Sequence, residues 1–230
     1  MKKRIAFVHN AMWEMYNFRG ELLQKLKAKG YEITVICPPD EKNAHYFTDL
    51  GIKLLTVPMS RKGTNIKEDV QLVKNLFKVY KKEKFDLVFH YTIKPNIYGT
   101  LAAKLARIKS IAITTGLGYV FLHNNITSFI AKFMYKFSLA FANEVWFLND
   151  DDMNIFLDKD LITERQAFKL PSEGINTKRF VPKEKNRKDS KTVFLMIARV
   201  LYDKGFNEYL EAAKLIKAQR NDVEFQLLGA

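Results

Sequence analysis

Short apolar segments alternate with amphipathic helices along most of this 230-residue chain. Strand-forming residues predict strands at 4–9, 31–37, 52–57, 86–90, 110–114, 144–148 and 167–170. Helices are predicted at 18–29, 66–82, 95–107, 127–142 and 150–157, with a short helix before residue 52. The buried face of helix 66–82 is predicted to be Val70, Val73, Leu76, Phe77 and Tyr80. Strands that alternate with helices form parallel sheets, so we expect a doubly wound α/β domain.

A second strand–helix–strand unit follows a polar stretch at 182–191, with strands at 192–199 and 223–228 and a helix at about 204–219. Parallel strands need cover on both faces, and this unit is too small to fold alone. We therefore expect a first domain at 1–170, an interdomain segment at 171–191, and an incomplete second domain at 192–230. The sequence would then be truncated at its carboxyl end. The alternative is that these two strands extend the first sheet.

The chain is basic, with 38 Lys and Arg against 25 Asp and Glu and a net charge of +13. An acidic partner is expected, and nucleic acid, anionic lipid and phosphorylated substrates all have the required charge. No zinc-ligand spacing or RNA-binding motif occurs, which argues against nucleic acid. The sequence has a single cysteine, Cys37, and its first 20 residues lack a signal-peptide pattern. These features predict a cytoplasmic protein, and no apolar run is long enough to span a membrane.

Ligands of doubly wound sheets bind at the carboxyl ends of the strands. The loops after residues 9, 90, 114, 170 and 199 are therefore the predicted site loops. The first of them, 9–20, reaches its predicted helix with a single glycine, Gly20. A dinucleotide-binding fingerprint needs three glycines, and its absence argues against a nicotinamide or flavin dehydrogenase. Gly20 either lets a phosphate approach backbone N–H groups or serves packing.

Two further loops carry polar residues that could bind a substrate. After strand 86–90 the chain presents Thr92, Lys94 and Asn96, and Lys94 would contact a phosphate or be solvated. After strand 110–114, Thr115 and Gly116 begin a tight loop that suits sugar hydroxyls or phosphate, or simply forms a turn.

His90 is the one candidate for a catalytic base, because it ends a strand at the expected ligand edge. A capped or exposed histidine is the alternative. The four histidines lack the spacing of metal ligands, and no nucleophile-elbow motif occurs. We expect neither a metal nor a cofactor.

Segment 126–142, which contains the predicted helix 127–142, is apolar around most of its helical circumference, with Lys132 and Lys136 one turn apart. Such helices are usually buried. The alternative is a surface helix that inserts aromatic side chains into a bilayer while its lysines meet lipid phosphates.

Three motifs together resemble the family 4 glycosyltransferases of the GT-B fold. The first is Gly174-Ile175-Asn176 with Phe180 and Pro182, which is similar to the interdomain segment of those enzymes. The second is Ala198-Arg199 with Lys204-Gly205, similar to the start of their nucleotide-binding domain. The third, residues 92–99 with 115–119, resembles a bacterial branch that adds sugars, often N-acetylgalactosamine, to lipid-linked oligosaccharide or capsule precursors.

The resemblance implies a complete Rossmann-like acceptor domain, followed by the first βαβ unit of a Rossmann-like donor domain. It implies transfer of an N-acetylhexosamine or hexose from a UDP-sugar to a polyprenyl-diphosphate-linked or other envelope glycan acceptor, with retention of anomeric configuration and without a metal. Two cations at a helix N-terminus suit a leaving diphosphate. Donor-diphosphate contacts are expected from Arg199, Lys204 and Gly20. Acceptor contacts are expected from Asn17, Thr92, Lys94, Asn96, Thr115 and Gly116.

Two departures from the family pattern qualify these expectations. The loop at 114–116 lacks the histidine that many members carry. The family's Glu-x7-Glu element, which binds donor ribose and sugar, would lie beyond residue 230. We therefore expect the intact protein to be a transferase on the inner face of the cell membrane, and this chain alone to be inactive. The alternative is an inactive module that binds membrane or glycan.

Overall fold

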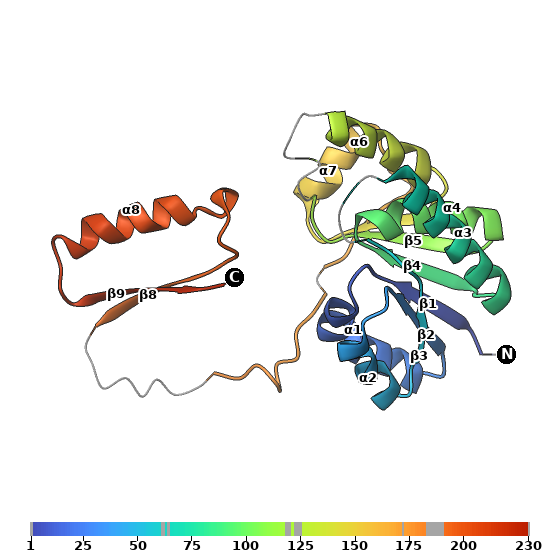
Figure 1. The fold of residues 1–230 in the computed structure, drawn as a ribbon, viewed down its shortest axis with the longest axis horizontal. Helices are drawn as coiled ribbons and strands as arrows, with labels where there is room; N and C mark the ends of the chain where they lie inside the picture. The colour runs from blue at the N-terminus through green and yellow to red at the C-terminus, as the bar shows by residue number, and fades with distance from the viewer. Residues whose placement is uncertain are drawn as a thin grey trace. The chain divides into compact units, whose positions relative to one another are not determined.

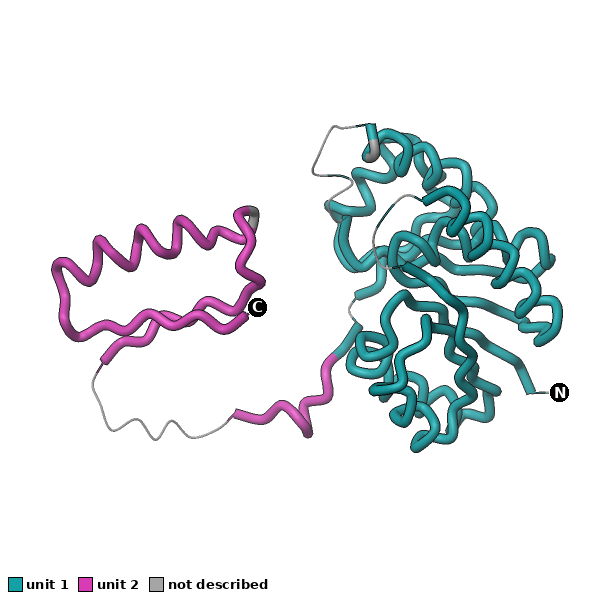
Figure 2. The backbone as a smooth tube through the Cα atoms, viewed as in Figure 1, with its two compact units in different colours: residues 1–174 teal, residues 175–230 magenta. Residues whose placement is uncertain are grey.

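The computed structural model describes residues 2–60, 63, 65–117, 121, 126–171, 173–182 and 191–229. The chain forms two compact units, Met1–Gly174 (unit 1) and Ile175–Ala230 (unit 2), which are coloured separately in Figure 2. Each unit has its own sheet.

Unit 1 is built on a sheet of seven parallel strands in the order β3-β2-β1-β4-β5-β6-β7 (Figure 1). The strands are β1 (Arg4–Val8), β2 (Glu32–Cys37), β3 (Lys53–Thr56), β4 (Leu87–Tyr91), β5 (Lys109–Thr114), β6 (Glu144–Phe147) and β7 (Ala167–Lys169). The helices are α1 (Met12–Ala28), α2 (Glu41–Asp49), α3 (Ile66–Glu83), α4 (Thr100–Ala106), α6 (Ile126–Leu139) and α7 (Asp150–Asp158). The predicted doubly wound α/β fold is confirmed. The winding direction reverses between β1 and β4, which makes this pair the switch point of the sheet.

Helices cover both faces of this sheet, as alternation along β1 shows. Ile5 and Phe7 pack into a core with α1 and α2, whereas Ala6 and Val8 pack into a core with α3 and α4. A third core lies between the β5–β6 end of the sheet and helices α6 and α7. Figure 1 shows α1 and α2 on one side of the strands and α3 and α4 on the other. Strands buried on both faces give the sheet its continuous apolar runs.

Helix α1 begins at Met12, so the prediction that it starts at residue 18 is wrong. Met12, Met15 and Leu23 form its buried stripe, each 1% exposed or less. The prediction relied on apolar residues from Leu22 onward, yet Leu22 is 42% exposed. The two methionines extend the helical stripe by two turns. The first site loop is correspondingly short.

The predicted helix 95–107 has two parts. A π-helical turn, η1 (Pro95–Gly99), precedes α4. It follows Thr92, whose φ of 69° is unusual for a β-branched residue. Such turns and such backbone angles occur often at functional sites.

Two predicted helix faces differ from the structure. On α3, Val70 is 48% exposed, and the buried positions are Asp69, Leu72, Leu76, Tyr80 and Glu83. The polar residues Asp69 and Glu83 are buried because each has an ion-pair partner. On α6, the expectation of an all-round buried helix is wrong, because Phe129 and Phe133 are 68% and 62% exposed.

Unit 2 contains β8 (Thr192–Ile197), a 3-10 turn η2 (Tyr202–Lys204), α8 (Phe206–Lys217) and β9 (Val223–Leu228). The two strands are parallel and form a separate sheet, so the alternative in which they extend the first sheet is wrong. The Tyr209 hydroxyl on α8 donates to carbonyl oxygens of both strands, 2.9 Å from Phe194 and 2.8 Å from Gln226. Helix α8 runs along the strand pair in Figure 1.

Candidate active site at the carboxyl edge of the sheet

The switch point of unit 1 brings together polar residues from β1, β4 and α1. His9 follows β1, Tyr91 ends β4, and Arg19 reaches them from α1. The Arg19 guanidinium lies 4.8 Å from the centre of the Tyr91 ring and forms an ion pair with Glu173. Arg19, His9 and Tyr91 are all less than 8% exposed. Crevices at this position of doubly wound sheets hold ligands.

Hydrogen bonds and burial fix the two aromatic members of this group. The Ala11 backbone N–H donates to His9 Nδ1 over 2.9 Å, which sets the orientation of the imidazole ring. Burial raises the pKa of Tyr91 to about 12, although the positive charge of Arg19 acts in the opposite direction. The Tyr91 phenol is therefore protonated at neutral pH and serves as a hydrogen-bonding and stacking surface.

Sequence reasoning missed Arg19, His9 and Glu173. A usable signal existed for Arg19, since residues 12, 15, 19 and 23 share one helical face and Arg19 is the charged member of that apolar stripe. No comparable signal marks Glu173, which meets Arg19 across a separation of 154 residues.

Thr92 and Asn96 lie where β4 ends, as predicted. Asn96 is 1% exposed, and its Nδ2 donates to the Ile113 carbonyl of β5 over 3.0 Å. Within the described residues, Thr92 Oγ1, Asn96 Oδ1 and Thr114 Oγ1 are buried without a hydrogen-bond partner. Buried polar atoms almost always have partners. Three such atoms at the ends of two adjacent strands suit the binding of a polar ligand.

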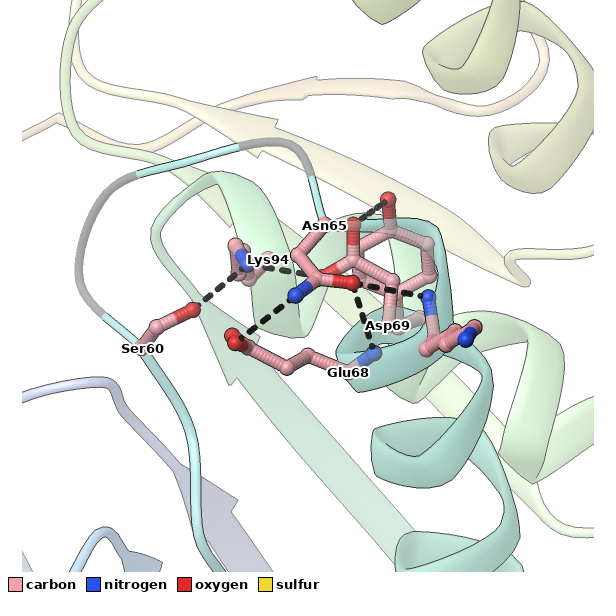
Figure 3. Close-up of polar contacts among 7 residues, drawn as sticks. Ser60, Asn65, Glu68, Asp69 and Lys94 are labelled. Carbon is pink, nitrogen blue, oxygen red and sulfur yellow. Dashed lines mark hydrogen bonds and ion pairs between the residues drawn. The ribbon is translucent and has the colours of Figure 1, made fainter.

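Lys94 lies in a buried ion pair, so it is neither solvated nor aimed at a free phosphate site (Figure 3). Its Nζ donates to Asp69 Oδ1 and to Ser60 Oγ, both over 2.7 Å. Asp69 Oδ2 accepts a further bond of 2.8 Å from the Tyr98 hydroxyl. Lys94, Asp69 and Ser60 also line a hollow of about 200 Å³. The lysine thus ties α3, η1 and the loop after β3 together.

His90 lies inside the core, and its geometry does not support the role of a catalytic base. It is 0% exposed, its Nε2 lies 2.9 Å from the Tyr80 hydroxyl, and its Nδ1 lies 3.4 Å from Thr100 Oγ1. Burial lowers its pKa to about 3. A β-carbon at Gly99 would fall 2.6 Å from the ring, so the imidazole is packed tightly. The strand-end position of His90 misled the prediction because its side chain points to the α3–α4 core.

Gly20 does not lie at a helix N-terminus, because α1 has already begun at Met12. Beyond the first turn, backbone N–H groups are bonded within the helix, so Gly20 cannot present its N–H to a diphosphate. Its close neighbour is the Tyr16 ring, 3.4 Å from a β-carbon built at this position. The packing alternative fits Gly20. Asn17 is exposed on the same helix.

The loop after β5 is exposed where the structure describes it. Thr115 and Gly116 are both exposed, and the φ of 137° at Gly116 is one that glycine adopts readily. Gly118 and Tyr119 of the same motif lie outside the described residues.

In unit 2, Arg199 and Lys204 occupy the predicted local positions. Arg199 follows β8, and Lys204 ends η2 directly before α8. Both side chains are exposed, and within the described part of unit 2 neither forms an ion pair. The helix N-terminus adds positive potential beside them. This strand-to-helix corner could hold an anion.

Comparison with known proteins identifies the family. The sequence profile described as "Glycosyl transferase 4-like" matches residues 4–149. The chain belongs to this family. The predicted resemblance is therefore confirmed for a stretch that includes the switch point and the strand ends just described.

Two curated members of this group are similar over most of the chain. One is the N,N'-diacetylbacillosaminyl-diphospho-undecaprenol alpha-1,3-N-acetylgalactosaminyltransferase of Campylobacter jejuni, 33% identical over 98% of this chain and 63% of its own length. The other is the UDP-Gal:alpha-D-GlcNAc-diphosphoundecaprenol alpha-1,3-galactosyltransferase of Escherichia coli, 25% identical over 81% of this chain and 50% of its own length. The chain thus spans between half and two thirds of these relatives.

A solved glycosyltransferase from Rickettsia africae has the same fold, with a TM-score of 0.62 at 15% identity, covering 100% of this chain and 69% of that one. Neighbours of this fold include GT-B glycosyltransferases and UDP-N-acetylglucosamine 2-epimerases. This likeness supports the GT-B fold class.

Proposed function

We propose that the protein is a retaining glycosyltransferase that moves an N-acetylhexosamine or hexose from a UDP-sugar to a polyprenyl-diphosphate-linked acceptor. The observation that carries this proposal is 33% identity, over 98% of the chain, to a transferase whose acceptor is an undecaprenyl-diphosphate-linked sugar. The relative from Escherichia coli has an acceptor of the same chemical type. The envelope glycan and the peripheral membrane location of the proposed enzyme follow from that acceptor.

In this proposal the donor diphosphate binds at the corner between β8 and α8. Arg199 and Lys204 are exposed there and have no competing ion pair in the described part of unit 2. They would offset the charge that develops on the leaving UDP, and one such contact contributes about 10²–10³-fold to turnover. Retention is proposed to follow from attack on the same face that the diphosphate leaves, with a phosphate oxygen accepting the proton of the acceptor hydroxyl.

The acceptor side is proposed to lie at the carboxyl ends of β4 and β5. Thr92 and Asn96 supply buried polar atoms there, and Thr115 and Gly116 form the exposed rim. Asn17 is a further candidate on the exposed side of α1. Lys94 acts indirectly in this scheme, because its ion pair with Asp69 holds η1, which carries Asn96.

The test is sugar transfer from UDP-N-acetylgalactosamine, UDP-galactose and UDP-glucose to a short prenyl-diphosphate-linked sugar. It should be run on residues 1–230 and on a chain that carries a complete donor domain. We propose that only the longer chain turns over, giving an α-linked product. The double variant Arg199→Ala/Lys204→Ala in the longer chain should lose at least 100-fold in turnover. Unchanged turnover in that variant would contradict the donor assignment.

Membrane association is proposed to use α6. Its outward side chains are large and apolar, with Ile126, Phe129 and Phe133 each more than 60% exposed. Lys136 is exposed on the same helix, and Lys104 of α4 lies 5.3 Å from the centre of the ring of Phe141, which follows α6. No helix in the described ranges has both the length and the apolarity to cross a bilayer. Aromatic side chains beside lysines suit shallow insertion into an anionic surface.

Vesicle sedimentation tests this part of the proposal. Phe129→Ser/Phe133→Ser should weaken binding to vesicles that contain phosphatidylglycerol by at least ten-fold, because two exposed phenyl rings no longer enter the bilayer. Phe18→Ser/Phe168→Ser is the matched control, since these rings are 61% and 47% exposed on other elements of unit 1. Equal losses in both double variants would contradict a role specific to α6.

A further inference from the structure

The Arg19 guanidinium is the buried cation of the switch point. Its side chain is 8% exposed, and it lies on the same stripe of α1 as Met15 and Leu23, which are fully buried. A charge in such surroundings costs several kcal/mol unless it is paired. The positive charge of Arg19 nevertheless lies at the edge of the sheet where doubly wound domains bind ligands.

Glu173 supplies the paired negative charge from a segment that follows β7. The Arg19 Nη2 group donates to its Oε1 atom. The two partners differ in exposure, because the Glu173 side chain is 27% exposed and the Arg19 side chain only 8%. Glu173 also lies in a stretch without helix or strand, whereas Arg19 is fixed by α1 and by the Tyr91 ring. The carboxylate can therefore leave while the guanidinium stays in place.

We propose that Arg19 is a receptor for the diphosphate of a substrate, and that Glu173 is an internal counter-ion which the diphosphate displaces. The inference rests on the proposed function, which supplies two diphosphate sources, the nucleotide and the prenyl-linked acceptor. Carboxylate and phosphate oxygens accept the same forked pair of N–H bonds from a guanidinium. A diphosphate carries more negative charge than one carboxylate, so it competes well for this position.

Three observations favour a ligand over a purely structural strut. The Arg19 guanidinium lies over the ring of Tyr91, which ends β4 beside β1, where the winding reverses. The residue after Tyr91 is Thr92, which has a left-handed backbone and a buried hydroxyl without a partner among the described residues. The chain carries a net charge of +13, which attracts anions to its surface. An ion pair with a structural role alone would need neither a place at the switch point nor the unpartnered hydroxyl of Thr92 beside it.

Removing the negative charge of Glu173 should improve the binding of a diphosphate. In Glu173→Gln the competing carboxylate is gone, while the amide still accepts a hydrogen bond from Arg19. Inorganic pyrophosphate should bind this variant of the 230-residue chain about ten-fold more tightly than the wild type. Arg19→Gln should lower the pyrophosphate affinity to the level that the exposed cations Arg199 and Lys204 of unit 2 provide alone, and Arg19→Lys should retain part of the difference.

Glu83→Gln is the matched control. Glu83 is also paired with an arginine, since Arg4 Nη2 lies 3.0 Å from its Oε2, and its side chain is 9% exposed. It ends α3 and pairs with Arg4, the first residue of β1, so it lies at the amino ends of the strands and not at their carboxyl ends. The variant changes net charge by the same amount as Glu173→Gln, so its pyrophosphate affinity should stay within two-fold of the wild type.

The experiment is titration calorimetry with pyrophosphate, UDP and farnesyl diphosphate on all five proteins, with thermal unfolding as a check that each is folded. A gain for Glu173→Gln with UDP assigns the site to the donor, and a gain with farnesyl diphosphate assigns it to the acceptor. A gain with pyrophosphate alone indicates a small-anion site and overturns the substrate role. Unchanged or weaker binding in Glu173→Gln overturns the proposal outright, as does full affinity in Arg19→Gln.

The outcome does not depend on sugar transfer. If transfer is absent but Glu173→Gln binds UDP or farnesyl diphosphate more tightly, the receptor stands and the proposed function fails. If transfer is present and Glu173→Gln shows no gain, the proposed function stands and Glu173 is only an anchor for its segment.

Discussion

The polar residues of the two units lie in opposite environments. In unit 1, Arg19, Lys94 and Asn96 are at most 8% exposed and each is bonded to a residue distant in the sequence. In unit 2, Arg199 and Lys204 are exposed and form no ion pair within the described residues. Helix packing explains the difference, because the seven-stranded sheet has helices on both faces, whereas α8 is the one α-helix in the described part of unit 2. These three buried residues of unit 1 are therefore coupled to stability, whereas Arg199 and Lys204 are not.

Separating the units should give the largest effect. Residues 1–174 should unfold cooperatively when produced alone, because all three apolar cores lie within them. Residues 175–230 should show little helix or strand by circular dichroism, because their buried apolar residues in the described ranges are Ala213 and Val223. A cooperative unfolding transition in the isolated 175–230 segment would break the comparison.

Lys94→Met should lower the free energy of unfolding by about 3–5 kcal/mol, because it leaves the Asp69 carboxylate buried without its cation. Denaturant titration of the 230-residue chain measures this change. Lys204→Met is the control in unit 2 and should change stability by less than about 0.5 kcal/mol. Equal effects of the two substitutions would show that the Lys94 network is not coupled to the core.

His90 should make unit 1 sensitive to acid. Its pKa is about 3 in the folded protein and about 6.5 when unfolded. Between these values the unfolded state binds a proton that the folded state does not, so stability falls as pH falls from 6.5 towards 3. The contribution is about 1.4 kcal/mol per pH unit. In His90→Asn, the slope of stability against pH between 6 and 4 should be shallower by this amount. An identical slope would contradict the burial of a neutral imidazole.

Arg199→Ala/Lys204→Ala should give the smallest effect on stability, less than about 0.5 kcal/mol by thermal or denaturant unfolding. Both side chains extend into solvent, so their removal leaves no buried group without a partner. A loss above 1 kcal/mol would indicate that these cations support the local fold and are not free for a ligand.

The sheet could be predicted from the sequence because each buried strand is a continuous apolar run between helices. The start of α1 could not, since Met12 and Met15 lie in a segment whose Gly20 and polar residues are typical of a loop. The sequence left the exposure of α6 open between a buried and a surface helix, because an apolar residue pattern is the same whether the helix packs in a core or lies at a surface.

Part of the candidate site could also be predicted. Thr92 and Asn96 follow β4 in the segment where the loop after strand 86–90 was expected, because the end of that strand could be read from its apolar run. The side-chain direction of His90 was not predictable, since one residue of register decides which face of a strand a side chain occupies. The role of Glu173 could not be predicted from the sequence, because only the tertiary structure brings it to Arg19, 154 residues away.

The order of strands in unit 1 has a consequence for how the protein is made. Strand β4 pairs with β1, with Ile5 opposite Leu87, so the central pair forms only after the intervening chain has been synthesised. Arg19 emerges from the ribosome early, meets Tyr91 later, and gains Glu173 only when unit 1 is nearly complete. In a nascent chain that stops before residue 173, the Arg19 guanidinium therefore lacks the carboxylate of Glu173. Anions in the cell can bind this guanidinium before Glu173 does.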